Sequence, residues 1–139
     1  MKPEEIKAAF AKSLEAPAEM PDQEQLTALH APGYVIHSSY GDYDLKGAVE
    51  LYTGLAKAFP DLQYHLEKIV LEGDTVAMRY TGTGTHKGEF LGVPPTGKKV
   101  TYKVMGFLRI AGDKIDEAWE QTDVYGVLQQ LGAIPAPKK

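Results

Sequence analysis

The sequence predicts an α+β domain, because helical periodicity dominates its first sixty residues and strand-like alternation dominates the rest. Up to Phe59, apolar residues recur every three to four positions. From Leu62 onward, apolar and polar residues alternate in four runs separated by turn residues. A chain of 139 residues has the size of one domain, which we expect to cover residues 1–139.

Three helices are expected before the long strands. The first covers residues 3–15, where Pro3 suits the first turn. The second begins at Asp22, a good capping residue, and ends near His30. The third, residues 46–59, has the clearest apolar face and is followed by a proline.

The remaining elements are strands and one closing helix. A short strand at residues 34–37 and a polar loop at 38–44 precede the third helix. The four long strands are expected to pair antiparallel, because tight turns join them at Gly73 and Gly112. They begin at Leu62, Thr75, Val100 and Lys114. A closing helix at 125–131 leaves a tail, 135–139, that we expect to be frayed.

Composition narrows the class of function. A net charge of -4 and a pI near 5.5 argue against nucleic-acid or anionic-membrane partners. No apolar run approaches the roughly 18 residues of a membrane span, and a cytoplasmic location is the default expectation. The chain has no cysteine, and its four histidines are scattered. We therefore expect no metal site and no cofactor.

The most specific segment runs from Gly84 to Gly97, with the sequence GTHKGEFLGVPPTG. Its glycines permit unusual backbone conformations, and its two prolines keep the chain extended. Phe90 and Leu91 are expected to anchor this loop on the body of the protein. His86 is expected to tether it.

This segment resembles the signature of the SnoaL-like polyketide cyclases, a family within the nuclear-transport-factor-2-like superfamily. The similarity covers roughly residues 4–134, and further matching pieces are Ala58–Asp61, Glu72–Asp74, Asp113–Trp119 and Leu128–Gly132. The resemblance implies a strongly curved sheet wrapped around three helices, in the shape of a cone with an internal pocket. It also implies pairing of two subunits through the outer face of the sheet.

Two carboxylates on the last strand are candidate catalytic groups. In characterised cyclases of the family, an aspartate on this strand is the general acid/base, and the resemblance places Glu120 there. A carboxylate buried near Trp119 would have a raised pKa. Asp123 is the rival, with capping of the closing helix as its alternative role. Where the cyclases have a histidine and an asparagine, this chain has Gly106 and Leu51.

Other polar side chains could assist a carboxylate. His37 resembles a pocket-mouth histidine of the superfamily, or it bonds a backbone carbonyl instead. Arg79, unusual in an apolar strand, could anchor an enol oxygen or pair with Glu117 or Glu120. The candidate substrate-binding residues are Tyr52, Tyr80, Tyr102, Trp119, Met78 and Phe90.

These features together predict a cofactor-independent enzyme that binds an apolar, carbonyl-bearing molecule and removes a proton next to the carbonyl. Cyclisation and isomerisation both begin with this step. The alternatives are a non-catalytic ligand-binding or dimerisation module, and an epoxide- or ester-type hydrolase. We also expect a homodimer, because strands 75–85 and 100–110 carry large side chains on both faces.

Overall fold

The computed structural model describes residues 2–15 and 23–135 of the chain. Its helices are α1 (Pro3–Ser13), α2 (Gln23–Leu29), α3 (Leu45–Ala58) and α4 (Val124–Gln130). Its strands are β1 (His30–Ser38), β2 (Gly41–Asp44), β3 (Gln63–Glu72), β4 (Thr75–Thr85), β5 (Lys99–Ala111) and β6 (Lys114–Thr122). The predicted cap at Asp22 and the tail beyond residue 135 lie outside the described residues.

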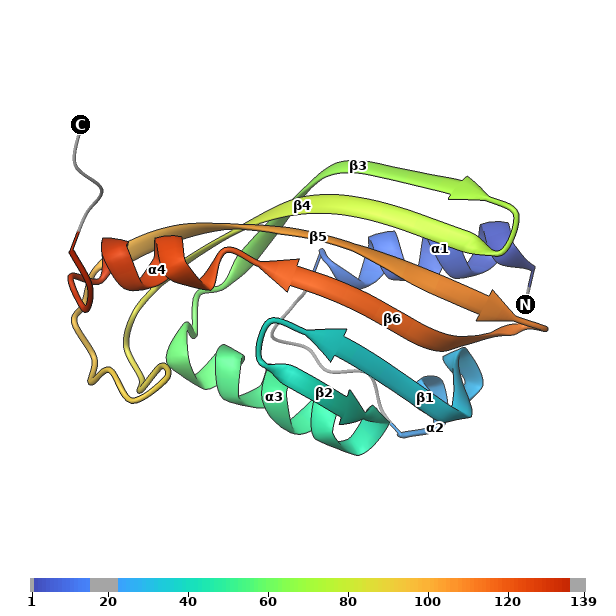
Figure 1. Cartoon of the computed structure of the whole chain (residues 1–139), viewed down its shortest axis with the longest axis horizontal. Coiled ribbons are helices and arrows are strands. Elements are labelled where there is room, and N and C mark those ends of the chain that lie inside the picture. Colours follow the sequence, from blue (N-terminus) through green and yellow to red (C-terminus); the bar gives the residue numbers. More distant parts are fainter. Residues whose placement is uncertain (1, 16–22, 136–139) are drawn as a thin grey trace.

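The strands form one six-stranded mixed sheet in the order β2-β1-β6-β5-β4-β3 (Figure 1). The α+β class is confirmed, but the prediction of a four-stranded antiparallel sheet with a short first strand is wrong. β1 is nine residues long and pairs with β6 in parallel, which local periodicity does not reveal. The predicted loop at 38–44 contains β2, which pairs with β1 through a turn at residues 39–40 that is followed by Gly41, where φ is 128°.

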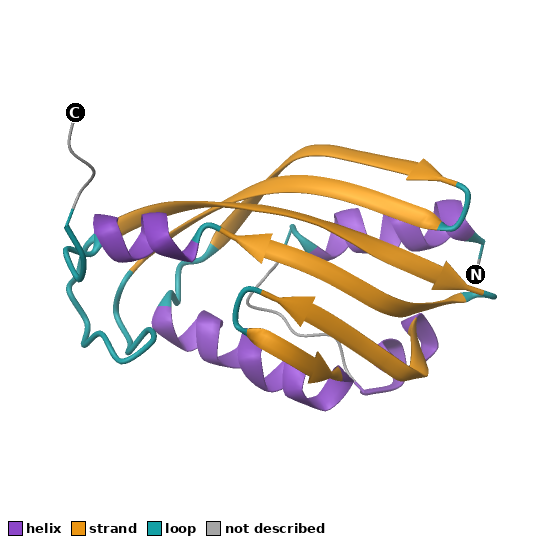
Figure 2. Cartoon of the chain, viewed as in Figure 1, coloured by secondary structure: helices purple, strands orange, loops and turns teal. Residues whose placement is uncertain are grey.

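Helices α1 to α3 lie behind the sheet in the view of Figures 1 and 2, and the strands curve over them. Register shifts within β3–β4 and β5–β6 mark irregularities in the pairing, a device that bends strands. Gly73 and Gly112 adopt positive φ in the two hairpin turns that the sequence predicts. Among the described helices, none combines the length and apolar character needed to cross a membrane.

Side chains alternate between the two faces of the sheet. The inner face, toward the helices, holds buried residues such as Met78 and Tyr80 on β4 and Val104 on β5. We call the opposite side the outer face. It presents the odd-numbered residues of β4, β5 and the second half of β6, several of which are large and exposed: Met105, Phe107 and Trp119.

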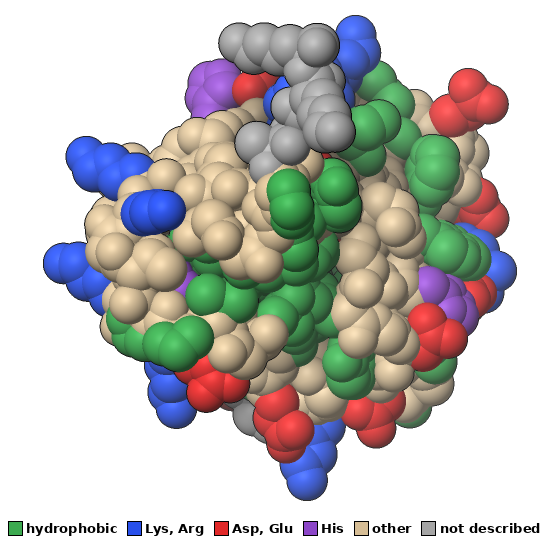
Figure 3. All heavy atoms as spheres, turned by 60° about the vertical axis from the view of Figure 1, so that its left-hand side comes forward, with side chains coloured by type: hydrophobic (Ala, Val, Ile, Leu, Met, Phe, Trp, Pro, Cys, Tyr) green, Lys and Arg blue, Asp and Glu red, His purple; other side chains and the backbone are tan. Residues whose placement is uncertain are grey.

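The loop 86–97 is tied to the body at both of its ends. His86 is fully buried beside Phe59, and the backbone N–H groups of Lys87 and Gly88 donate to the carbonyl of Ala58, which supports the predicted tether. At the other end of the loop, the backbone N–H of Thr96 donates to Nδ1 of His86. Phe90 is buried against Phe59 and Tyr40. Leu91, however, is 56% exposed, so its predicted anchoring role is wrong. Apolar side chains gather on this end of the molecule (Figure 3).

Candidate active site

Glu120 projects from β6 toward the inner side of the sheet, next to buried Ala118 in the alternation of the strand. Its Oε1 accepts a hydrogen bond of 3.0 Å from the hydroxyl of Tyr52 on α3. Part of the residue's surface remains accessible, but protein atoms enclose the carboxylate. This burial raises the pKa of Glu120, and hydrogen bonds from Tyr52 and Tyr80 oppose the rise.

Phenol groups from five elements and one turn interact electrostatically with this carboxylate. Tyr52 belongs to α3, and the charge of Glu120 also raises the pKa of tyrosines on β1, the β1–β2 turn, β3, β4 and β5. The full set, which we call the tyrosine cluster, is Tyr34, Tyr40, Tyr52, Tyr64, Tyr80 and Tyr102.

Burial keeps the hydroxyls of the cluster protonated. It is the largest cause of the raised pKa in each case, and the pKa of Tyr64 reaches about 12. The hydroxyl of Tyr102 donates to that of Tyr64 at 3.2 Å. The interior therefore combines one carboxylate with neutral hydrogen-bond donors. From the sequence we singled out Tyr52, Tyr80 and Tyr102; the other three tyrosines could be added only once the strand faces were known.

Asp123 does not join this group. It is exposed at the N-terminus of α4, where its Oδ1 accepts a 2.9 Å hydrogen bond from the N–H of Gly126. This geometry is the capping role that the sequence offered as the alternative. The structure thus separates the two candidate carboxylates, one inside and one outside.

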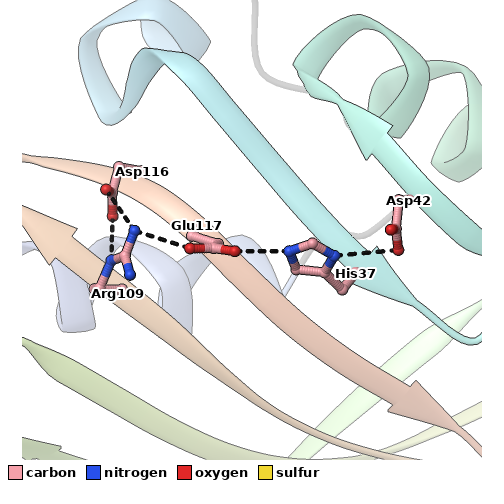
Figure 4. Close-up of polar contacts among 5 residues, drawn as sticks. All are labelled: His37, Asp42, Arg109, Asp116 and Glu117. Atoms are coloured by element: carbon pink, nitrogen blue, oxygen red, sulfur yellow. Dashed lines mark hydrogen bonds and ion pairs between the residues drawn. The ribbon is translucent and has the colours of Figure 1, made fainter.

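His37 lies on the outer face, within a network of charged residues (Figure 4). Its Nε2 is 2.7 Å from Oε2 of Glu117, and its Nδ1 is 3.2 Å from Oδ1 of Asp42. The pKa of His37 is raised, chiefly by the hydrogen bond to Glu117. The guanidinium of Arg109 contacts Glu117 and also Asp116, at 2.8 and 2.9 Å. Sequence reasoning did not single out Arg109, Asp42 or Asp116.

The other predicted site residues divide between the two faces. Arg79 and Trp119 belong to the outer face, so they do not approach Glu120 from within, and Arg79 pairs in register with Met105. Glu117 and Glu120 were the predicted partners of Arg79. In the structure Glu117 contacts Arg109, and Glu120 contacts Tyr52. Met78 is buried in the core, and Phe90 is buried between the loop and α3.

Two hollows open at the surface of the described residues, and Glu120 lines neither of them. One of about 290 Å³ lies beside the His37 network and is lined by Ala31, Gly33, Val35, His37, Arg109, Asp116 and Glu117. The other, of about 310 Å³, lies at the start of α3 and is lined by Leu45, Lys46, Val49 and Glu50. The internal pocket that the resemblance implies is therefore not among them.

Comparison with known proteins identifies the chain's relatives. The model of the SnoaL-like polyketide cyclase family matches residues 9–131. The chain belongs to this family. Among curated protein sequences, none matches it.

Solved structures of SnoaL-like proteins agree with this assignment. AclR of Streptomyces galilaeus, a proposed hydroxylase, is 34% identical, with a TM-score of 0.83 over 99% of this chain and 87% of AclR. IdmH of Streptomyces antibioticus, a proposed polyketide cyclase, is 30% identical, with a TM-score of 0.76 over 95% of this chain and 99% of IdmH. A proposed cyclase from Jannaschia sp. CCS1, 24% identical with a TM-score of 0.81 over 94% of each chain, shares the fold.

The close approach of β5 and β6 in this chain explains why a glycine stands opposite Glu120. Gly106 pairs with Glu120 across β5 and β6. A Cβ at position 106 would collide with the carbonyl oxygen of Trp119 and lie 3.1 Å from the Cα of Glu120. The two strands are thus too close for the histidine that the resemblance implies here. In this chain the phenols supply the hydrogen bonds to the carboxylate.

Proposed function

We propose that this SnoaL-like protein catalyses proton transfer at a carbon atom next to a carbonyl, with Glu120 as the base. The single observation that supports this proposal is the inward-facing Glu120 carboxylate, which accepts hydrogen bonds from Tyr52 and Tyr80 and has a raised pKa. Such a carboxylate accepts a proton more readily than an exposed one, since water does not stabilise its charge.

The tyrosines suit the charge movement of this reaction. When Glu120 takes the proton, the electrons of the C–H bond form the carbon–carbon double bond of an enolate, and its oxygen becomes negative. One negative charge is present in the interior before and after the step. Tyr52 and Tyr80, which hydrogen-bond to Glu120 at rest, can then donate to the enolate oxygen.

The fate of the enolate distinguishes cyclase from isomerase chemistry. Attack of its carbon on a second carbonyl of the same molecule closes a ring. Return of the proton from Glu120 to a different carbon moves a double bond. Membership of the polyketide cyclase family favours the first outcome. We expect the substrate to be an apolar molecule with several carbonyl groups, and its entry requires space beside Glu120.

The test is exchange of carbon-bound hydrogen for deuterium in a panel of apolar 1,3-dicarbonyl esters, followed by NMR. Glu120→Gln is expected to slow exchange by about 10²–10⁴-fold, the usual contribution of a general base. Glu72→Gln makes the same change at an exposed end of β3 and serves as the control. Exchange that is equally fast in wild type and Glu120→Gln would overturn the proposal. Binding of the esters without any exchange would favour the non-catalytic alternative.

We also propose that the outer face pairs two copies of the chain. Phe107, Met105 and Val70 are 51%, 57% and 44% exposed there, a large apolar exposure for a monomer. If the whole face is buried, the five longer strands, about 4.8 Å apart and about 30 Å long, give roughly 700 Å² per copy, or about 1,400 Å² in total. Stable interfaces begin near 1,200 Å².

Sedimentation velocity at micromolar concentration tests the dimer. The wild type is expected near twice the 15.2 kDa chain mass, and Phe107→Glu near one chain mass. Leu91→Glu places the same charge on an exposed apolar residue of the loop 86–97, and this control should remain dimeric. A wild type that sediments as a single chain would refute the dimer.

A further inference from the structure

One lateral row of residues crosses the outer face from edge to edge. The strand registers place its members side by side, in the order Asp42, His37, Trp119, Phe107, Ala77 and Val70. The β3 half of this row is apolar. At the β2 end of the row, Asp42 and His37 belong to the charged network of Figure 4. The proposed dimer would bury both halves together.

The charges of this network find their partners within one chain. His37 contacts Glu117 and Asp42, and Arg109 contacts Glu117 and Asp116, all at 2.7–3.2 Å. A face whose charges are already paired does not need an oppositely charged partner. It is suited to contact with an identical face, where like charges would otherwise meet.

Both ring nitrogens of His37 face carboxylate oxygens. An imidazolium donates a hydrogen bond from each nitrogen, whereas a neutral imidazole has only one N–H. Deprotonation would therefore direct a nitrogen lone pair at either Asp42 or Glu117. In a single chain water can relieve this contact, because the side chain of His37 is 34% exposed and a hollow of about 290 Å³ lies beside it.

A second copy on the outer face would remove that water. We propose that protonation of His37 controls self-association, so that the dimer is tighter when both ring nitrogens carry a proton. This inference rests on the proposed dimer and is independent of the chemistry at Glu120. The occupant of the face is a second copy of this chain.

The charged groups around His37 indicate that its protonation favours the dimer. With His37 protonated, the network holds three carboxylates and two cations; without the proton, only one cation remains. The ring also stacks on Trp119 from β6, with centroids 5.7 Å apart, a contact that favours a cation. Burial against a second copy thus costs more once the proton is lost.

The sign of the pH dependence follows. Hydrogen bonds to Glu117 and Asp42 raise the pKa of His37 above 6.5, against the effect of partial desolvation. Because the dimer favours the charged form, association takes up protons. The affinity is therefore highest below the pKa of His37 in the monomer, and it falls as pH rises from that pKa through the higher pKa of His37 in the dimer.

The experiment measures the dimer dissociation constant by sedimentation equilibrium between pH 5 and pH 8.5. The wild type is expected to dissociate at least about tenfold more readily at pH 8.5 than at pH 5, which corresponds to about half a pKa unit at each of the two His37 side chains of a dimer. His37→Gln should have a pH-independent, weaker dimer. His37→Arg keeps a permanent positive charge, so it should retain tight association at pH 8.5. His65→Gln is the control, since His65 on β3 has a 79% exposed side chain and lies 3.9 Å from Glu67.

The outcomes separate this inference from the dimer itself. A wild type that is dimeric with the same affinity at every pH would overturn the role of His37 and leave the dimer intact. A pH dependence that persists in His37→Gln, or that disappears in His65→Gln, would also overturn it. A wild type that is monomeric throughout would refute the dimer and this inference together.

Discussion

Glu117 and Glu120 belong to the same strand but face different environments. Glu117 points to the outer face, where Arg109 and His37 neutralise it. Glu120 points inward, where phenols surround it. The choice of Glu120 as the proposed base therefore depends on the face of β6 and on its neighbours, since the residue type is the same.

The buried charge of Glu120 should reduce stability at neutral pH. Its pKa is higher in the folded than in the unfolded chain, so stability is lost as pH rises from the unfolded pKa through the folded pKa. Glu120→Gln should therefore unfold less readily than the wild type at pH 8, by about 1.4 kcal/mol for each unit between the two pKa values. The advantage should vanish near pH 3. Urea denaturation at both pH values measures it, and an advantage that is equal at both would contradict the buried charge.

Asp123 is expected to contribute stability only. Asp123→Ala removes the cap of α4 and should lower the free energy of unfolding by about 1 kcal/mol, within the usual range of 0.5–2 kcal/mol. Because the carboxylate is exposed and away from the tyrosine cluster, proton exchange in the ester panel should stay at the wild-type rate. A loss of exchange in a folded Asp123→Ala variant would instead return Asp123 to the catalytic group.

At the scale of elements, the sequence pattern predicted helices and tight turns, which depend on residues close together in the chain. The helices 3–15 and 46–59 and the glycine turns at positions 73 and 112 appear in the structure close to their predicted places. The parallel pairing of β1 with β6 joins residues such as His37 and Trp119, which are 82 positions apart, and no local pattern reports it. The family resemblance places His37 at a pocket mouth, whereas its register with Trp119 places it on the outer face.

The tyrosine cluster was only partly predictable, because some of its members are placed by local strand alternation and others by the packing of distant elements. Alternation on β4 and β5 places Tyr80 and Tyr102 on one face, whichever face that is. The position of Tyr52 on α3 relative to β6 requires the packed fold. Family resemblance supplied Glu120, and the structure shows the phenols that accompany it.

The close approach of β5 and β6 at Gly106 makes a prediction about both strands. Gly106→Ala should lower the free energy of unfolding by about 1–3 kcal/mol, because the new methyl group meets the backbone of β6. Gly54→Ala is the matched control: no atom lies within 4 Å of its added Cβ, and alanine favours a helix by up to about 1 kcal/mol. Urea denaturation of both variants measures their free energies of unfolding. If Gly106→Ala were as stable as Gly54→Ala, the close approach of β5 and β6 would be contradicted.

At the scale of the whole molecule, the curved sheet separates two activities. Its inner face carries the proposed chemistry, and its outer face carries the proposed contact between copies. The backbone of the sheet lies between the two sets of side chains, and neighbouring residues of β6 serve opposite faces. Substitutions on one face are therefore expected to act independently of those on the other.

This independence can be measured with two variants. Glu120→Gln should lose proton exchange and keep the dimer affinity of the wild type within about twofold, and Phe107→Glu should be monomeric and retain exchange. Their combination should show both defects and no additional one. If the monomeric variant lost exchange while its fold, judged by circular dichroism, was intact, the two faces would be coupled.

The most direct test of the central claim is the pKa of Glu120 itself. Selective ¹³C labelling of glutamate and an NMR titration, assigned with Glu120→Gln, would report the carboxyl signal of this residue. A pKa clearly above the ordinary glutamate value of about 4.3, rising further in Tyr52→Phe because a hydrogen bond to the charged form is lost, is the result that we predict. A pKa at or below about 4.3, unchanged in Tyr52→Phe, would show that Glu120 is not an enclosed base and would contradict the proposed function.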